Sequence, residues 1–503
     1  MSSNECVKHN CAYLYGLKKI GVIGAGLSSL YASCHLAKRG FEVSVFDKNN
    51  MPGGRSQFFK DKGFTFDMGP SWYWMPEVID RLFNDLSENR EDYFKLTRLD
   101  PAYKVYWSDK SATTIPMEHE KLIALFDSFE KNGGQKLEHF LSDAKIKYDI
   151  SMGSFIENPG LKISELLKFN ILKDALKLDV FKSVEKDIEN RFSSDKARNI
   201  LNFPVLFLGE RPSKIPALYT LMNYADLELG TWYPEGGMNA LAGALEKIAS
   251  KLGVEFHYNT TVDSIKIENG KATSILANNL CYDFDSIVAG ADYHHVEQNL
   301  LPKKFRRYNS NYWESRKMAP SALIFYLGFD KKIEALVHHN LFFDEDLKDH
   351  GEEIYDTPKW PTRPLFYACT PSKTDATVAP ENCENLMILI PIAPNLKDNE
   401  TIRENYLERI LSRLEQHCKE PLKKHIIYKN SFCINDFKSA YNSYKGNAYG
   451  LANTLKQTAH LKPKIKSKVK NLYFCGQLTV PGPGIPPALI SGKIAAKQLI
   501  ADL

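Results

Sequence analysis

The chain has 503 residues, enough for roughly two to four domains, and its apolar content of 43% and charged content of 25% are ordinary for a globular protein. The net charge of +4 is small for this length, so the composition gives no reason to expect a nucleic-acid partner. The nine cysteines are scattered without a CxxC spacing, which favours a reducing compartment and predicts no metal cluster. Residues 1–17 lack the apolar centre of a secretory signal and are expected to form a flexible tail. No apolar run approaches the roughly 18 residues that a membrane span needs.

The first predicted elements are a strand, a glycine turn, a helix and a second strand. Residues 20–23 form a short apolar run that is typical of a buried parallel strand. The run ends at Gly24-Ala25-Gly26, and a helical pattern then extends over 27–38. A second strand is expected over 42–46 and ends at Asp47. This order predicts the βαβ unit of a Rossmann-like sheet.

The turn at Gly24 and Gly26 suits a dinucleotide. Two glycines let the backbone approach a pyrophosphate, and the helix that begins at Leu27 offers free N–H groups and the positive end of its dipole. Asp47 follows Gly26 by 21 residues, where a carboxylate is expected to meet a ribose hydroxyl. An ordinary βαβ unit with a glycine turn is the alternative, because Ser29 stands where the fingerprint has its third glycine.

A second glycine pair narrows the choice of dinucleotide. Gly53, Gly54 and Arg55 follow the second strand and add a flexible backbone approach and a cation. This extension suits a ligand with a diphosphate and a further ring system, which NAD enzymes do not need. We therefore expect FAD.

The next loop is expected to pass close to a planar ring. A short strand ends at Gly69-Pro70, and Ser71 continues the loop. The aromatic run Trp72-Tyr73-Trp74 then either lines an apolar tunnel or forms a packed aromatic turn, and a helix begins near Pro76.

The segment 101–225 leaves the nucleotide unit. Residues 99–116 alternate around a polar turn and predict an antiparallel hairpin, and 118–202 are mostly helical in pattern. Within 161–190, apolar residues alternate with six lysines at 162, 168, 173, 177, 182 and 186. This pattern predicts either helices that contact a membrane surface or a helical substrate region with a solvated lysine face.

A second α/β segment follows. Residues 217–225 and 239–251 predict helices, residues 254–258 predict a strand, and 262–267 are expected to pair with 272–276. A further strand over 286–289 ends in Gly290-Ala291-Asp292. Because this segment has no phosphate loop of its own, we expect it to complete the first sheet, with the backbone of Val262 meeting the adenine.

Residues 301–460 alternate between apolar strand patterns and a long helical pattern over 401–418, which predicts a mixed sheet with helices. His294-His295 and His338-His339 are adjacent pairs. Neighbouring side chains on a strand point to opposite faces, so neither pair predicts a metal site.

The last segment again reads as strand, loop and helix. Residues 471–476 form an apolar strand that ends at Gly476, and Gln477 opens a loop of glycines and prolines before a helix expected over 489–499. The N-terminus of this helix, near Gly484, is expected to face a reduced flavin. Cys475 is expected to pack within the strand rather than to anchor the flavin.

Along nearly its whole length the sequence resembles the bacterial carotenoid (phytoene-type) desaturases of the flavin amine oxidase superfamily. The resemblance rests on IGAGLSSL, VFDKNNMPGGR, FTFDMGPSWYWMPEV, RPSKIPALYTLMNYADLELGTWYPEGGM, PSKTDATVAPE and NLYFCGQLTVPGPGIPPALISGK. The sequence departs from the family pattern at Ser28-Ser29, where glycines are usual, and at Gln477, where a smaller or acidic residue is common. The second departure would alter contacts to the flavin or its phosphate.

The resemblance implies an α/β fold with a discontinuous, Rossmann-like FAD-binding domain over 18–100, 226–300 and 461–503. A substrate-binding domain of mixed sheet and helices would occupy 101–225 and 301–460, with 161–190 as membrane-contact helices. FAD would be held non-covalently and no metal would be needed. The expected cofactor contacts are Gly24, Gly26, Leu27, Ser28, Asp47, Lys48, Gly54, Arg55, Gly69, Pro70, Ser71, Val262, Asp292, Gly476, Gln477, Gly484, Ile485 and Pro486.

The implied reaction introduces C=C bonds into a membrane-derived carotenoid. A hydride passes from an allylic carbon to the flavin, and the adjacent carbon then loses a proton. In related enzymes an acid and a basic residue one helical turn apart have been suggested as a proton relay, and the matching positions are Glu165 and Lys168. An exposed salt bridge between them is the alternative. Oxygen or a quinone would accept the electrons, and the enzyme would lie in the cytoplasm, peripherally on the inner membrane.

Within this family the chain most resembles 1-hydroxycarotenoid 3,4-desaturases, which act near one end of a conjugated chain. A phytoene desaturase that performs several steps is the alternative. A flavin amine oxidase and a non-catalytic escort protein on the same FAD fold are alternatives of another class.

Overall fold

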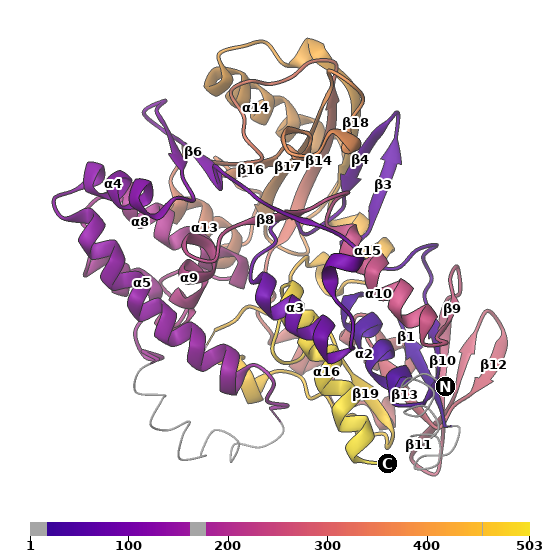
Figure 1. Cartoon of the computed structure of the whole chain (residues 1–503). Helices are drawn as coiled ribbons and strands as arrows, with labels where there is room; N and C mark the ends of the chain where they lie inside the picture. Colours follow the sequence, from indigo (N-terminus) through magenta and orange to yellow (C-terminus); the bar gives the residue numbers. More distant parts are fainter. Residues whose placement is uncertain (1–17, 161–177, 455) are drawn as a thin grey trace.

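Two sheets organise the protein, and both are visible in the computed structural model of Figure 1. The structure describes residues 18–160, 178–454 and 456–503. A parallel sheet occupies the lower right of Figure 1, a mixed sheet lies above it, and a group of helices extends to the left. Among the helices of the described ranges, none combines the length and the apolar character needed to cross a membrane.

The parallel sheet has the strand order β19-β13-β1-β2-β9. Its strands come from distant parts of the chain: β1 (Lys19–Ile23), β2 (Glu42–Phe46), β9 (Glu255–His257), β13 (Ser286–Ala289) and β19 (Leu472–Phe474). Ile20 and Val22 of β1 are fully buried, as expected for a sheet that is covered on both faces. The predicted parallel sheet, completed by segments remote in sequence, is therefore confirmed.

Four helices pack near this sheet: α2 (Leu27–Lys38), α3 (Pro76–Asp85), α10 (Asn239–Lys251) and α16 (Ile485–Ala501). Helices α2 and α16 cross closely at Gly492. A Cβ added to this glycine would lie only 2.0 Å from the carbonyl oxygen of Ser28. The predicted start of the last helix at residue 489 is wrong, since α16 begins at Ile485. Pro486 and Pro487 belong to its first turn, where a missing N–H leaves no hydrogen bond unmade.

The mixed sheet has the order β18-β14-β17-β16-β15-β6-β7. All its neighbouring pairs are antiparallel except β6 and β15, which run parallel. The predicted hairpin over 99–116 is confirmed as β6 and β7. The strands are β6 (Tyr103–Trp107), β7 (Ala112–Ile115), β14 (Ser321–Phe329), β15 (His339–Phe343), β16 (Phe366–Cys369), β17 (Glu384–Ile392) and β18 (Ile426–Phe432).

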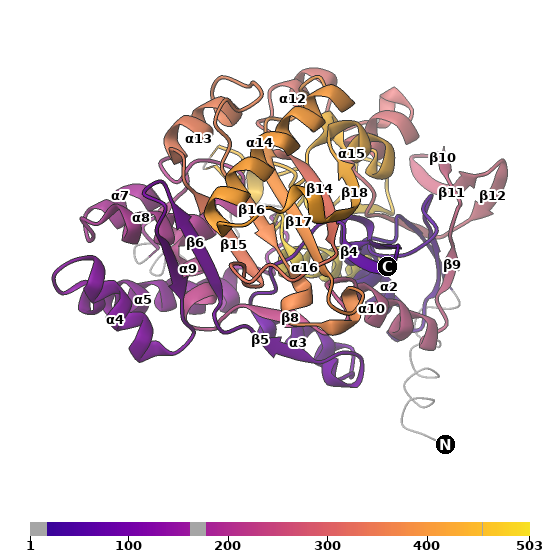
Figure 2. The ribbon, with the colours of Figure 1, turned by 90° about the horizontal axis from the view of Figure 1, so that it is seen from above.

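The two faces of the mixed sheet belong to different cores. Phe325 and Ile388 pack in a core with Ile410 of α14 (Glu400–Cys418), which lies across the sheet in Figure 2. Ile324 and Leu341 point to the other face and join the large core that is shared with the parallel sheet. This second face looks toward the site described below.

The remaining strands form small sheets: β3 (Phe58–Asp61) with β4 (Phe64–Asp67), β5 (Leu96–Arg98) with β8 (Trp232–Pro234), and β10 (Val262–Glu268), β11 (Lys271–Ala277) and β12 (Leu280–Asp283) together. The antiparallel pairing of β10 with β11 confirms the hairpin predicted over 262–276.

The helical group contains α4 (His119–Phe129), α5 (Gly133–Ile150), α7 (Val184–Glu189), α8 (Asp195–Asn202) and α9 (Leu221–Leu227). The helix predicted over 217–225 is a 3-10 turn, Ala217–Thr220, that continues into α9. Shorter helices elsewhere are α11 (Tyr293–His295), α12 (Ser310–Glu314), α13 (Leu347–Tyr355) and α15 (Ile434–Tyr441). Residues 161–177 of the expected membrane-contact region lie outside the described residues.

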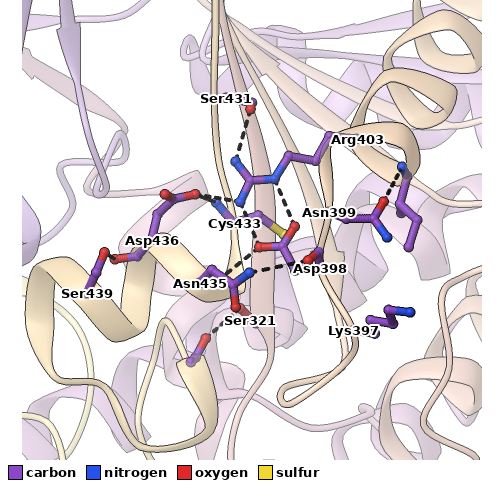
Figure 3. A network of polar contacts seen from close by, with 12 residues as sticks. Ser321, Lys397, Asp398, Asn399, Arg403, Ser431, Cys433, Asn435, Asp436 and Ser439 are labelled. Atoms are coloured by element: carbon purple, nitrogen blue, oxygen red, sulfur yellow. Dashed lines mark hydrogen bonds and ion pairs between the residues drawn. The ribbon is translucent and has the colours of Figure 1, made fainter.

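A network of charged groups fixes the start of α15 beside the mixed sheet (Figure 3). The Arg403 guanidinium donates to Asp398 at 2.7 Å and to Asp436 at 2.7 Å. Asp436 also accepts the backbone N–H of Cys433 at 2.8 Å, which closes the first turn of α15. Burial opposes ionisation of Asp398, but the hydrogen bonds from Arg403 and Asn435 hold its pKa below the usual value. The network thus orients α15, whose last residues line the site.

Candidate active site

One cavity of about 1620 Å³ lies between the parallel and mixed sheets. Its wall contains all eighteen of the predicted cofactor contacts, from Gly24 to Pro486. Ligand pockets commonly measure about 300–1,000 Å³, so this cavity has room for more than one small ligand. The structure therefore gathers the predicted residues around a common space.

The two glycines of the turn beside the cavity are needed for different reasons. Gly24 has a φ of +91°, and a Cβ there would lie 3.0 Å from the backbone nitrogen of Ala291. Gly26 has an ordinary φ of −73°, and a Cβ built on it meets nothing within 4 Å. Gly24 is thus needed by the fold, whereas the open space at Gly26 is available to a ligand.

Helix α2 begins at this open space. Its N-cap is Gly26, and no side chain caps the helix. The first N–H groups of a helix have no partner within the helix, so those that follow Gly26 are suited to an anion. Leu27 and Ser28, which carry the first of these groups, line the cavity.

Asp47 ties the end of β2 to the glycine turn. Its Oδ2 accepts the backbone N–H of Ala25 at 2.7 Å, and its Oδ1 accepts that of Asn49 at 2.8 Å. Burial raises the pKa of Asp47, while these two N–H groups and Lys48 oppose the rise. The Asp47 carbonyl also accepts the N–H of Thr260 at 2.8 Å, which brings Val262 to the same wall.

The serine in place of the third fingerprint glycine has a matching glycine opposite it. A Cβ added to Gly290, at the end of β13, would lie 1.9 Å from the Ser29 hydroxyl oxygen. The close packing of helix on strand is therefore kept, with the small residue moved from the helix to the neighbouring strand. This arrangement explains why Ser29 is tolerated.

Arg55 is enclosed beside the turn. Its Nη2 donates to Ser443 Oγ at 3.0 Å and its guanidinium carbon lies 5.3 Å from the centre of the Tyr441 ring, whereas Nε has no hydrogen-bond partner in the described part of the chain. Burial lowers the pKa of Arg55, and the Asp292 carboxylate opposes this shift. A guanidinium in the cavity wall suits a phosphate oxygen.

Tyr441 and Ser443 are site residues that the sequence did not reveal. Tyr441 is the last residue of α15 and Ser443 lies just beyond it, almost 400 residues away from Arg55 in sequence. Lys48 makes a parallel connection, donating to Asn442 Oδ1 at 3.2 Å and to the carbonyl of Ser439. No spacing or motif around these positions signals their role.

The C-terminal loop closes another side of the cavity. Gly476 has a φ of +105°, and its N–H donates to Ser491 Oγ at 3.0 Å. Gly484, with a φ of +110°, is the N-cap of α16, which also begins without a side-chain cap. The start of α16 and Gln477 thus line the same space as the start of α2.

The aromatic run combines both predicted roles. Trp72 and Trp74 line the cavity, while Tyr73 is fully buried outside its wall. Ser71 Oγ accepts a 3.0 Å hydrogen bond from the Tyr367 hydroxyl of β16. Beyond this point the wall becomes apolar; it includes Phe203, Leu206, Met222, Ile324, Leu341, Phe343 and Leu389.

Of two further expectations, one is not tested and one is wrong. The expected proton relay, Glu165 and Lys168, lies outside the described residues. The expectation that the side chains of His338 and His339 point apart is wrong, since their ring centres lie 4.5 Å apart. His338 precedes β15, which begins at His339, so the alternation of a strand does not apply to this pair.

The residues around the turn fit a flavin dinucleotide. Beside the open space at Gly26, the uncapped start of α2 and the Arg55 guanidinium provide donors for a diphosphate. The start of α16 and the loop through Ser71 leave space for a ring system on the mixed-sheet side.

Comparison with known proteins agrees with this geometry. The chain is 36% identical to a carotenoid 3,4-desaturase of Haloarcula japonica over 487 residues, which covers 96% of this chain and 98% of that protein. It is 32% identical to a 4,4'-diapophytoene desaturase (4,4'-diaponeurosporene-forming) of Staphylococcus aureus over 499 residues, which covers 96% and 99% of the two chains.

Solved structures share the fold at lower identity. An oxidoreductase from Methanosarcina mazei superposes with a TM-score of 0.63 at 18% identity, covering 95% of this chain and 100% of that one. Putrescine oxidase gives a TM-score of 0.61 at 15% identity, covering 96% and 99%. The family model described as flavin containing amine oxidoreductase matches residues 27–500. The chain therefore belongs to the family of flavin containing amine oxidoreductases.

Proposed function

We propose that the protein is an FAD-dependent carotenoid desaturase that introduces C=C bonds into a membrane-derived polyene. The observation that carries the proposal is a single cavity with a dinucleotide turn on one side and an apolar wall on the other. The identity of 36% to a carotenoid 3,4-desaturase supports the same reaction here. Within this class we favour 3,4-desaturation of a 1-hydroxycarotenoid over multi-step desaturation of phytoene.

The contacts of the cofactor follow from the site. The diphosphate is assigned to the start of α2 at Gly26 and to Arg55, and the flavin ring to the loop through Ser71 and the start of α16. Residues 18–100, 226–300 and 461–503 would form the FAD-binding part, and 101–225 and 301–460 the substrate-binding part. Non-covalent binding is favoured because burial raises the pKa of the Cys475 thiol to about 11, which keeps this cavity-lining sulfur protonated and poorly nucleophilic.

FAD would supply the hydride acceptor for the reaction. The protein orients the polyene along the apolar wall and excludes water from the allylic carbon, so that positive charge on the polyene is not trapped by solvent. Trp72, Phe203 and Leu341 contribute to this wall. For the proton that leaves the adjacent carbon, Glu165 and Lys168 remain the proposed relay.

Contact with a membrane surface is proposed for the segment 161–190. In its described part, Leu178 and Val180 line the cavity, whereas the neighbouring Phe181 side chain is 95% exposed. A short stretch that reaches both the cavity and the outside with apolar side chains suits a polyene arriving from a bilayer. We propose a peripheral position on the cytoplasmic side of the inner membrane, with oxygen or a quinone as electron acceptor.

The test supplies purified holoprotein with liposomes that contain either a 1-hydroxycarotenoid or phytoene. We expect one new double bond at the 3,4 position of the hydroxylated substrate, detected by its absorption shift and mass. Conversion of phytoene to lycopene would overturn the choice of substrate but not the reaction class. Peroxide release with a polyamine and no polyene product would establish an amine oxidase, and a colourless protein without flavin would indicate an escort role.

A further inference from the structure

Three potential metal ligands meet at the start of β15, behind the loop that carries Ser71. They are His338, His339 and Cys369, and their ligand atoms all lie within 4.8 Å of one another. His339 and Cys369 are directly paired across β15 and β16, so their side chains share one face of the sheet. His338 is held beside them because its carbonyl accepts the N–H of Thr370 at 2.8 Å. All three residues are at most 4% exposed.

The two imidazoles are oriented from outside the cluster. His338 Nδ1 lies 2.7 Å from Thr374 Oγ1, and His339 Nδ1 lies 2.6 Å from the Tyr367 hydroxyl. That hydroxyl donates onward to Ser71, so it accepts from His339. Histidines that bind a metal through one ring nitrogen usually donate from the other in this way.

The second ring nitrogen of each histidine is not used by the protein. The Nε2 atoms of His338 and His339 are buried and have no hydrogen-bond partner in the part of the chain that the structure describes. An unsatisfied buried polar atom is costly, and here two of them belong to residues of one cluster that also contains a cysteine. The cost is removed if both nitrogens bind one cation.

A small space lies beside two of the three residues. His338 and Cys369 border a cavity of about 20 Å³, which has room for roughly one water molecule or ion. The carboxyl side chain of Asp67 lies on the same small cavity and would offset positive charge.

We propose that His338, His339 and Cys369 form a binding site for one zinc-like cation, with two nitrogen ligands and one sulfur ligand. Binding displaces the Cys369 thiol proton to solvent, and the cation takes the resulting thiolate together with the two neutral imidazoles. Ligand atoms around tetrahedral zinc lie about 3.5 Å apart, so the side chains close by about 1 Å on binding. The site would clamp β15 to β16 behind the Ser71 loop, and this role does not depend on the reaction proposed above.

The test uses chelator-treated holoprotein titrated with Co²⁺ as a spectroscopic probe and then with Zn²⁺. We expect one equivalent of Co²⁺ to produce a thiolate-to-cobalt charge-transfer band, and Zn²⁺ to remove the band and raise the Tm. Cys369→Ser and His339→Gln should abolish the band, whereas the matched control Cys281→Ser, at an exposed cysteine, should retain it.

X-ray absorption of the zinc-loaded wild-type protein keeps the proposal testable if a variant fails to fold. It should show two nitrogen neighbours at about 2.0–2.1 Å and one sulfur at about 2.3 Å. Absence of a stoichiometric Co²⁺ band in the wild type, a band that survives Cys369→Ser, or zinc without a sulfur neighbour would overturn the site.

Discussion

The substitution Gly26→Ala separates the fold from cofactor binding. A Cβ at Gly26 meets no atom within 4 Å, and the φ of −73° is one that alanine adopts readily. The apoprotein should therefore keep its stability or gain about 0.4–1 kcal/mol, because alanine restricts the unfolded chain. The added methyl group, however, occupies the space at the start of α2 where we place the diphosphate.

The expected loss of affinity follows from the bonds that the methyl group blocks. A hydrogen bond to a charged acceptor contributes about 1.5–3 kcal/mol, so displacing the diphosphate from two N–H groups weakens FAD binding by about 100-fold or more. Titration of apoprotein with FAD, followed by the quenching of flavin fluorescence, measures this change directly.

Gly243→Ala is the matched control for this experiment. Gly243 lies within α10, outside the cavity wall, and a Cβ there also meets nothing within 4 Å. It should show the same or a larger gain in apoprotein stability and an unchanged Kd for FAD. Wild-type affinity in Gly26→Ala would refute the placement of the diphosphate.

Three further substitutions test other parts of the structure. Arg55→Met should leave the apoprotein folded but weaken FAD binding by about 10- to 100-fold, since it removes a cation from the cavity wall; an unchanged Kd would contradict the assignment. Lys462 is buried without a hydrogen-bond partner among the described residues, and burial lowers its pKa from 10.5 to about 7. Between pH 7 and 10.5 the unfolded chain then binds more protons than the folded one, so the free energy of unfolding should rise with pH by at most about 5 kcal/mol. Lys462→Met should remove this rise in a series of thermal melts, and parallel pH profiles would refute it. Leu341→Trp should fill part of the apolar end of the cavity and so reduce desaturation without changing flavin content. Undiminished turnover would show that the polyene lies elsewhere.

Local chemistry explains which parts of the fold were predictable. The helix over 27–38 and the strand over 42–46 were predicted with the bounds that the structure shows, because glycine turns delimit a strongly periodic pattern. That the strands of the second α/β segment join the first sheet was also predictable, since this segment has no phosphate loop of its own; the order of the strands was not predicted. The start of α16 was missed because prolines normally break a helix, although they are tolerated in its first turn.

The predictable part of the site was the part carried by motifs. Every predicted cofactor contact in the glycine turns and the C-terminal loop lies in the wall of one cavity, although the cofactor role of each remains a prediction. Tyr441 and Ser443 were missed because their contact with Arg55 depends on how α15 is oriented by Arg403, which no local pattern records. The His338-His339 pair was misread because strand alternation was applied one residue beyond the strand.

The order of strands in the parallel sheet also bears on how the protein is made. One edge of β1 is covered only by β13, which lies more than 260 residues later in the chain. The free edge of β13 is in turn covered only by β19, near residue 474. Contacts of such long range form slowly and leave strand edges exposed in the meantime. The loop at Gly476 and the start of α16 are synthesised later still, so a nascent chain has no complete pocket. Capture of the flavin therefore requires that α16 has been made, and a chain that stops before Gly476 would fold in part but stay colourless.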